Sequence, residues 1–318
     1  MVNAPTTSED FSRFSLRRLG VTRERVRTVA WNLDGRRLAA GGSPSLRIFL
    51  PDKDTRTSTE CRGHTGEVSC VRWSPVHPER LASVSSGDDK ALHFWFVPIT
   101  LFANCWTSSL IAQGSKPTST IETYGNNIHM NWSPDGKTIV VGTTKDRLMW
   151  VDVEEQRVVN RIDMDKETND TQFSHNGSLL YTGVEGSVRI SAFPSNELVY
   201  TVPMTSMPVG MLDLDPRGRY LLAGGNDATV SLWETEEWTC AASAGHHDGP
   251  LLTCRFNHDG SLVASIATGD VVISSVPGLK KEHSIPFADG ASQDLAWHPS
   301  RNVLAYAGNE VCIWGYGV

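Results

Sequence analysis

The sequence lacks the segments that would direct a protein into a membrane or through the secretory route. Residues 1–20 contain no apolar core of a signal peptide, and no stretch reaches the ~20 apolar residues of a membrane-spanning helix. The cysteines show no CxxC spacing, and their scatter indicates reduced thiols rather than a disulfide framework: Cys61, Cys70, Cys105, Cys240, Cys254 and Cys312. We therefore expect a soluble, intracellular protein that makes no membrane contact.

Common catalytic motifs are absent as well. The chain has no P-loop, no GxSxG, no HExxH and no paired-carboxylate motif. Its net charge of −7 and pI near 5.8 do not fit a general nucleic-acid binder, so we expect RNA contact to be indirect or weak at most. We predict a protein with no catalytic residues, no cofactor, no bound metal and no small-molecule substrate.

The chain does contain one sequence pattern seven times: an aromatic or apolar anchor residue, a turn, and a short apolar run. The anchors are Trp31, Trp73, Trp132, Phe173, Leu214, Phe256 and Trp297. Successive anchors lie 42, 59, 41, 41, 42 and 41 residues apart. A period near ~41 residues is typical of a four-stranded propeller blade. The repeat therefore predicts an all-β fold, a seven-bladed β-propeller.

The copy at residues 61–96 shows the expected strands of one blade. Alternation from Val68 ends at Trp73, prolines break the chain at 75 and 78, and further strands are predicted at 81–84 and 91–95. Five copies carry a glycine at the same place in the first turn, where a tight hairpin needs a positive φ: Gly35, Gly136, Gly177, Gly218 and Gly260.

This copy resembles the WD40-repeat family. Gly63-His64, Asp89 and Trp95 match the GH…D…W signature of that family. The resemblance implies a hydrogen-bonded chain across the blade, formed by His64, Ser83, Asp89 and Trp95. Asp227 and Trp233 repeat the six-residue spacing and are assigned to the same structural role, although Thr205 occupies the histidine position there.

Other copies have lost more of the signature. His247 lies in phase with His64, but its repeat ends in Ile273-Ser274 without a tryptophan. We expect such blades to depend on packing of alternating apolar side chains instead.

The two ends of the chain are predicted to close the ring. The last copy ends with a third strand at 311–314, and residues 14–19 alternate apolar and polar side chains before the first copy. We expect this N-terminal strand to complete the last blade, which removes open sheet edges. The domain prediction is a disordered tail at residues 1–13 and a single propeller at residues 14–318.

One spacing is irregular, and its surplus of residues falls at about 97–113. This uncharged segment contains Trp106 and several aliphatic residues. Three hypotheses stay open: a partner-binding loop, a spare strand or helix on the rim, and a retained intron whose removal restores the regular spacing.

Three clusters of like residues have competing interpretations. Two groups of histidines suggest the hypothesis of a metal site: positions 64, 77 and 93, and positions 246, 247 and 258. Their positions in repeats and turns favour structural roles instead. Six arginines within residues 11–27 suggest the hypothesis of a surface patch that binds RNA or an acidic partner. The favoured interpretation is the polar face of the closing strand. The acidic stretch 152–170 is interpreted as an exposed outer hairpin.

Longer stretches resemble one branch of the WD40 family, the subunit 3 proteins of the THO complex. They are VAWNLDGRRLAAGG, NNIHMNWSPDGKTIVVGTTKDRLMWVD, GRYLLAGGNDATVSLWE and LAWHPSRNVLAYAG, and the similarity runs over all seven repeats. The segment at 97–113 and the short final loop at 308–310 depart from the pattern of that branch.

This resemblance implies a nuclear, non-catalytic scaffold in the transcription–export assembly, which acts in mRNA packaging and export. The expected partners are the large helical THO subunits and other proteins of that assembly. The alternative is a WD40 adaptor or peptide reader in another nuclear complex, either chromatin-modifying or ubiquitin-ligase. A reader would need a central funnel lined by aromatic and acidic side chains, and an enzyme would need convergent titratable groups there.

Overall fold

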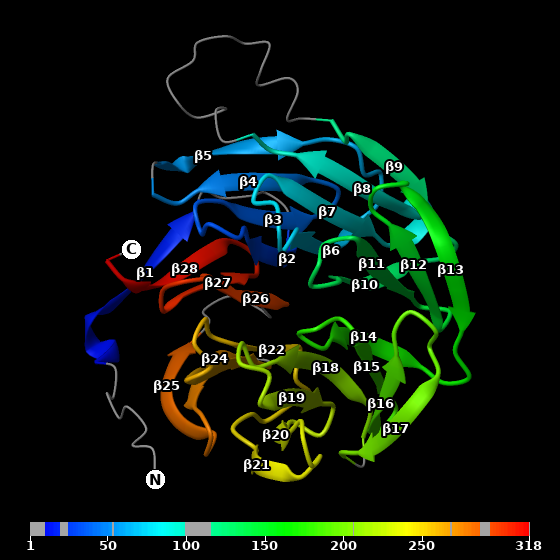
Figure 1. The fold of residues 1–318 in the computed structure, drawn as a ribbon. Helices are drawn as coiled ribbons and strands as arrows, with labels where there is room; N and C mark the ends of the chain where they lie inside the picture. Colours follow the sequence, from blue (N-terminus) through cyan, green and yellow to red (C-terminus); the bar gives the residue numbers. More distant parts are fainter. Residues whose placement is uncertain are drawn as a thin grey trace.

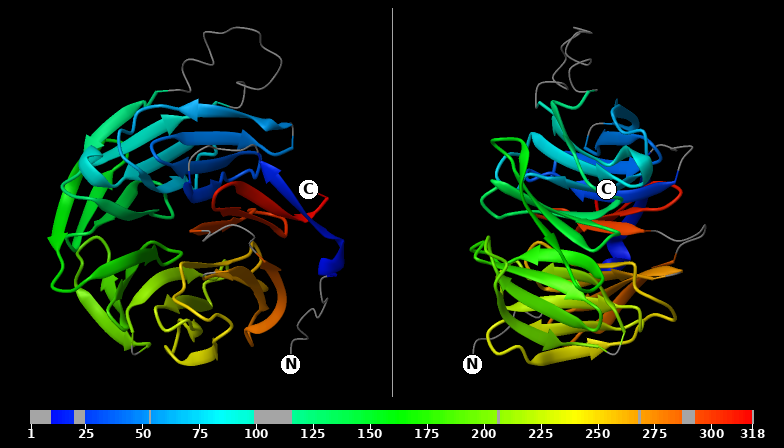
Figure 2. Two further views of the ribbon diagram at one scale, coloured as in Figure 1. Left: turned by 180° about the vertical axis from the view of Figure 1, so that it is seen from behind. Right: turned by 90° about the vertical axis from the view of Figure 1, so that its right-hand side faces the viewer.

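The protein forms a closed ring of seven antiparallel sheets, each with four strands (Figure 1). The structure is a computed structural model that describes residues 10–19, 25–52, 54–98, 116–205, 207–267, 269–286 and 293–317. The innermost strands of the sheets lie around a common centre, and the view from behind shows the same circular arrangement (Figure 2). The predicted all-β, seven-bladed propeller is confirmed.

The first four blades follow one another along the chain. Blade 1 contains β2 (Val26–Trp31), β3 (Leu38–Gly42), β4 (Leu46–Leu50) and β5 (Asp54–Cys61). Blade 2 contains β6 (Val68–Trp73), β7 (Arg80–Ser85), the short 3-10 helix η2 (Gly87–Asp89), β8 (Ala91–Phe96) and β9 (Ser119–Glu122). Blade 3 contains β10 (Asn127–Trp132), β11 (Thr138–Thr143), β12 (Arg147–Asp152) and β13 (Arg157–Asp163). Blade 4 contains β14 (Thr168–Phe173), β15 (Leu179–Val184), β16 (Ser187–Ala192) and β17 (Leu198–Pro203).

The remaining blades complete the circle. Blade 5 contains β18 (Val209–Leu214), β19 (Tyr220–Gly225), β20 (Val230–Glu234) and β21 (Cys240–Ala244). Blade 6 contains β22 (Thr253–Phe256), β23 (Leu262–Ile266), β24 (Asp270–Ser275) and β25 (Lys280–Pro286). Blade 7 contains β26 (Asp294–Trp297), β27 (Val303–Ala307), β28 (Val311–Tyr316) and, from the other end of the chain, β1 (Phe14–Leu19).

Strand β1 closes the ring as predicted. It pairs antiparallel with β28 from Phe14 opposite Tyr316 to Leu19 opposite Val311, and the two strands lie side by side in Figure 1. Leu19 is 1% exposed and packs in the cluster shared by blades 7 and 1. Ring closure therefore combines the pairing of β1 with β28 and the burial of apolar side chains.

The N-terminal tail differs in part from the predicted disordered segment at residues 1–13. Residues 1–9 lie outside the described residues, whereas Phe11–Arg13 form the 3-10 helix η1, capped by the Asp10 side chain. The Phe11 ring lies 5.6 Å from the ring of Trp314. Apolar contact with blade 7 therefore extends the ring closure beyond β1.

The hydrophobic core is divided into layers between blades. Among the described residues, each of the seven blade-to-blade contacts has its own cluster of buried apolar side chains. The second and third strands of most blades are nearly continuous in burial, because both of their faces are covered by neighbouring sheets. A blade therefore buries its faces only against its neighbours.

Local chemistry explains why the strands reverse where they do. The five repeated turn glycines have φ of 70° or 71°, a conformation that side chains with a Cβ rarely adopt. At Gly35 the amide donates to the Asn32 carbonyl and closes the turn. The predicted turn function of these glycines is confirmed.

The predicted insertion falls between β8 and β9. Val97, its first residue, is 2% exposed and packs in the cluster between blades 1 and 2. Residues 99–115 lie outside the described residues, so the three hypotheses for this segment stay predictions.

Candidate functional site

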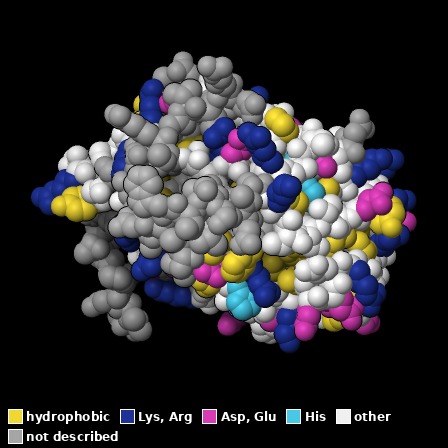
Figure 3. Space-filling view, turned by 90° about the horizontal axis from the view of Figure 1, so that it is seen from above, with side chains coloured by type: hydrophobic (Ala, Val, Ile, Leu, Met, Phe, Trp, Pro, Cys, Tyr) yellow, Lys and Arg dark blue, Asp and Glu magenta, His cyan; other side chains and the backbone are white. Residues whose placement is uncertain are grey.

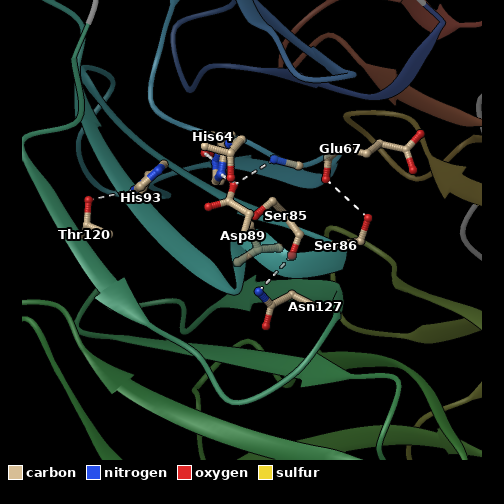
Figure 4. A network of polar contacts seen from close by, with 12 residues as sticks. His64, Glu67, Ser85, Ser86, Asp89, His93, Thr120 and Asn127 are labelled. Atoms are coloured by element: carbon tan, nitrogen blue, oxygen red, sulfur yellow. Dashed lines mark hydrogen bonds and ion pairs between the residues drawn. The ribbon is translucent and has the colours of Figure 1, made fainter.

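A hydrogen-bonded chain crosses blade 2 between its strands and the loops at its rim, and Figure 4 shows the end of it where His64 meets Asp89. Trp95 Nε1 donates to Ser83 Oγ at 2.8 Å, and Ser83 Oγ lies 2.7 Å from His64 Nε2. His64 Nδ1 lies 2.7 Å from Asp89 Oδ2, which also accepts from the Thr65 amide at 3.1 Å. The structure thus brings together the four residues that the sequence grouped in this blade.

The protonation of His64 fixes the direction of the chain. Burial lowers the pKa of His64 to about 4, and the neighbouring His93 lowers it further against the opposing effect of Asp89. The pKa of Asp89 is lowered, since hydrogen bonds to the carboxylate outweigh its burial. His64 is therefore neutral at pH 7 and donates from Nδ1 to Asp89, while its Nε2 accepts from Ser83.

The same cluster contains three groups with metal-ligating chemistry. One ligand atom each of His64, Asp89 and His93 lies within 4.8 Å of the others, and His93 Nδ1 is 2.9 Å from Thr120 Oγ1. His77 is exposed and is not part of this group. Both ring nitrogens of His64 already have partners, so a metal would have to break the chain across the blade. The geometry favours the structural role.

Blade 5 does not join its two predicted residues. Trp233 Nε1 donates to Ser231 Oγ at 2.9 Å, whereas Asp227 Oδ1 accepts from Thr229. Ala223 pairs with Ser231 in the position where blade 2 has Ser83 opposite His93. Because Ala223 has no hydroxyl at this position of β19, no hydrogen bond among the described residues links Trp233 to Asp227.

Blade 6 contains a partial chain that the sequence analysis did not assign. His247 Nε2 lies 2.8 Å from Ser265 Oγ, and its Nδ1 lies 3.5 Å from Asp270 Oδ1. Ser274 occupies the position of Trp95 in the ladder. The sequence signal for this contact is that His247 occupies the same repeat position as His64. A histidine at this position predicts a hydroxyl-bearing partner on the second strand of the same blade, here Ser265.

The centre of the ring has a cavity of about 230 Å³ at the start of the inner strands. Its charged lining residues are Arg27, Arg72, Arg255, Asp170 and Asp294. Asp294 Oδ2 accepts from Thr28 Oγ1 at 2.9 Å and from the Val29 amide at 3.1 Å, and it lies 3.6 Å from Arg72 Nη1. These contacts connect blade 7 with blades 1 and 2.

A second carboxylate connects two other blades. Asp170 Oδ2 accepts from the Leu212 amide at 3.1 Å. It was assigned to the exposed acidic hairpin, and this assignment is wrong. Asp170 lies on the inner strand β14 and is 5% exposed, because the hairpin ends at Asp163 and the chain then turns inward.

Burial also changes the titration of Asp213, which interacts with the lining residue Arg255 of this central cavity, called the channel below. It raises the pKa of Asp213 to about 6, although Arg255 and the Phe256 amide, 2.7 Å from Asp213 Oδ2, favour the charged form. Arg255 Nη1 donates to the Leu212 carbonyl of the neighbouring blade at 2.9 Å. Titratable groups do converge here, but their contacts run between blades. Among the described residues, no phenylalanine, tyrosine or tryptophan lines the cavity.

Three of the six arginines of residues 11–27 are paired with acidic side chains. Arg27 lies 2.9 Å from Glu67, Arg18 lies 3.5 Å from Glu310 and Arg13 lies 3.3 Å from Asp10. Basic and acidic side chains are also interspersed on the described surface seen from above in Figure 3. The contacts therefore favour the polar face of the closing strand over an RNA-binding patch.

Comparison with known proteins agrees with the repeat pattern. The family described as WD domain, G-beta repeat matches residues 55–95 and 196–234. THO complex subunit 3 of Arabidopsis thaliana is 29% identical, over 91% of this chain and 88% of its own. WD repeat-containing protein AAC3 of Dictyostelium discoideum is 26% identical, over 96% of this chain and 66% of its own.

A solved structure has the same fold. The β-propeller domain of Cps50 (Swd1) from Myceliophteria thermophila superimposes with a TM-score of 0.79, covering 95% of this chain and 99% of that one at 18% identity. Within the described residues, no helix has the length and apolar character needed to cross a membrane.

Proposed function

We propose that this chain, a WD40-repeat propeller, is a non-catalytic scaffold subunit of a THO-type complex. The carrying observation is the extent of its similarity to THO complex subunit 3, 29% identity over 91% of the chain. A match of that length includes blades that lack the WD40 hydrogen-bonded chain, such as blade 5, so it does not depend on the generic repeat motif alone.

The construction of the ring supports a scaffold rather than an enzyme. Carboxylates in the channel accept hydrogen bonds from the neighbouring blade, as Asp294 does from Val29 and Asp170 from Leu212. Charged groups that hold blades together are not free to act on a substrate. A rigid closed ring presents loops and outer strands to several partners at once, which suits a docking platform.

In this role the chain would work in the nucleus, in mRNA packaging and export. Its partners would be the large helical THO subunits and other proteins of the transcription–export assembly. The paired arginines near the N-terminus favour indirect RNA contact, through those subunits.

Purification of the tagged full chain from nuclear extract tests the proposal. We expect the large THO subunits to be recovered with the tagged chain but not with the tag alone, and to remain after ribonuclease treatment. Recovery of a methyltransferase or ubiquitin-ligase core instead would support the alternative, an adaptor in another nuclear complex. Loss of all partners after ribonuclease treatment would contradict a protein-docking role.

A further inference from the structure

The outer strands of the seven blades form the rim of the ring and leave one edge without a strand neighbour. In each sheet the outermost strand pairs on one side only: β1, β5, β9, β13, β17, β21 and β25. Such an edge presents unpaired backbone N–H and C=O groups that can pair with another chain. Proteins commonly protect these edges with charged side chains.

Five of the seven outer strands carry that protection. Each of β1, β5, β9, β13 and β25 contains at least one charged residue, for example Arg157, Arg161 and Asp163 in β13. The sixth, β21, is uncharged but consists of cysteine, alanine and serine, which offer little apolar surface.

Strand β17 carries no charge and is not made of small residues; its one protective feature is Pro203 at its end, which lacks a backbone N–H and offers only its carbonyl to another strand. Its sequence LVYTVP contains no charge, and three successive large side chains are exposed: Leu198 by 52%, Val199 by 58% and Tyr200 by 54%. It lies at the outer rim of blade 4 in Figure 1. A bulge at Val199 bends the beginning of the strand, so the regular edge runs from Tyr200 to Pro203.

We propose that the edge of β17 is a docking site for an extended segment of a large partner subunit, which adds a fifth strand to blade 4. The segment would pair along Tyr200–Pro203 and lay uncharged, apolar side chains against Leu198, Val199 and Tyr200. Since β17 offers no charge to pair with, a charged residue facing it would be desolvated without compensation. This inference rests on the proposed scaffold function and assigns it a surface.

The size of the site favours a large partner over a second copy of this chain. A stable interface buries roughly 1,600 Å² in total, and pairing along a four-residue edge supplies only a fraction of that area. Two copies joined edge to edge at β17 would be held by little else. A large subunit can touch the ring elsewhere and use β17 as one anchor.

The equivalent positions of blade 3 provide a matched control. In β17, Tyr200 pairs with Ile190 and directly follows the bulged residue Val199. In β13, Asn160 pairs with Trp150 and directly follows the bulged residue Val159. Val159 is 45% exposed, similar to its counterpart, but its strand carries two arginines and an aspartate. Val199→Lys with Tyr200→Lys is therefore compared with Val159→Lys with Asn160→Lys, in the full-length tagged chain.

We expect the β17 double variant to recover at least about tenfold less of the large THO subunits than wild type, and the β13 double variant to match wild type. Both should melt within about 2 °C of wild type, because exposed positions are changed. Wild-type recovery by the β17 variant, or an equal loss in the β13 variant, would overturn the inference while leaving the proposed function standing.

Two further outcomes also count against it. If the wild-type chain recovers no large THO subunit, the proposed function fails, and the partner inferred for β17 fails with it. Sedimentation of the purified wild-type protein should show a monomer. A dimer that the β17 variant abolishes would assign the edge to a second copy of the chain instead.

Discussion

The imidazole of His64 donates from Nδ1 to the carboxylate of Asp89 at 2.7 Å, and so joins two loops that lie 25 residues apart at the rim of blade 2. Ser83 and Trp95 extend this contact into the strands. Blade 2 therefore has a polar tie in addition to its apolar packing, and blade 5 lacks the equivalent.

Replacing Ser83 with alanine should be costly. The change leaves His64 Nε2 and Trp95 Nε1 buried without partners, so we expect a loss of about 2–3 kcal/mol in the free energy of unfolding, measured by urea denaturation. Ser231→Ala is the control. Ser231 accepts a hydrogen bond from the partly buried Trp233 but is hydrogen-bonded to no histidine among the described residues, so its replacement should cost about 1 kcal/mol. Equal losses would contradict a continuous chain in blade 2.

Deleting residues 11–20 should weaken the whole ring rather than one end of it. The deletion removes β1, exposes the edge of β28 and uncovers Trp314, which lies 4.6 Å from the Phe14 ring. We expect the melting temperature to fall by roughly 10 °C in one cooperative transition. Arg18→Ala, an exposed position on the same strand, should change the stability by about 0.5 kcal/mol or less, because it breaks only an exposed ion pair with Glu310. An unchanged melting temperature for the deletion would refute closure by β1.

Acid should destabilise the protein through His64. Its pKa is about 4 when folded and near 6.5 when unfolded, so between these values the unfolded chain binds a proton that the folded chain does not. Stability is therefore lost as the pH falls from 6.5 to 4, by up to about 3 kcal/mol from this group.

The variant His64→Asn separates this contribution from others. Burial also lowers the pKa of His298 to about 4, so part of the acid sensitivity should persist in the variant. We expect His64→Asn to be less stable at pH 7 but to lose less stability between pH 7 and pH 4.5, measured by urea unfolding. A slope identical to that of wild type would show that His64 does not titrate in this way.

The channel carboxylate Asp294 should matter far more than a surface carboxylate. Asp294→Ala removes the acceptor of Val29 and Thr28 and leaves the half-buried Arg72 with one fewer counter-charge, so we expect a loss of about 3 kcal/mol. Asp163→Ala breaks an exposed pair with Arg147 and should cost about 0.5 kcal/mol or less. Thermal unfolding of the two variants side by side checks the difference, and comparable melting temperatures would contradict it.

The spacing of residues in the sequence predicted their positions in the blade more reliably than it predicted the hydrogen bonds between them. The six-residue interval from Asp227 to Trp233 equals that from Asp89 to Trp95, yet only the second pair belongs to a connected chain. A connected chain needs every intermediate group, and Ala223 offers no hydroxyl where blade 2 has Ser83. The Thr205 hydroxyl, in the histidine position, instead donates to the Met207 carbonyl.

The sequence by itself determined the number of blades, the turns and the closing strand, because these depend on short-range properties: period-two burial, glycine conformations and a 41- to 42-residue spacing. Only the tertiary structure decided which groups meet at the channel and which outer edge lies bare. Asp170 reaches the Leu212 amide of the next blade. The exposure of β17 depends on its place as last strand in the sheet. Such relationships join residues through the curvature of the ring, which no local pattern encodes.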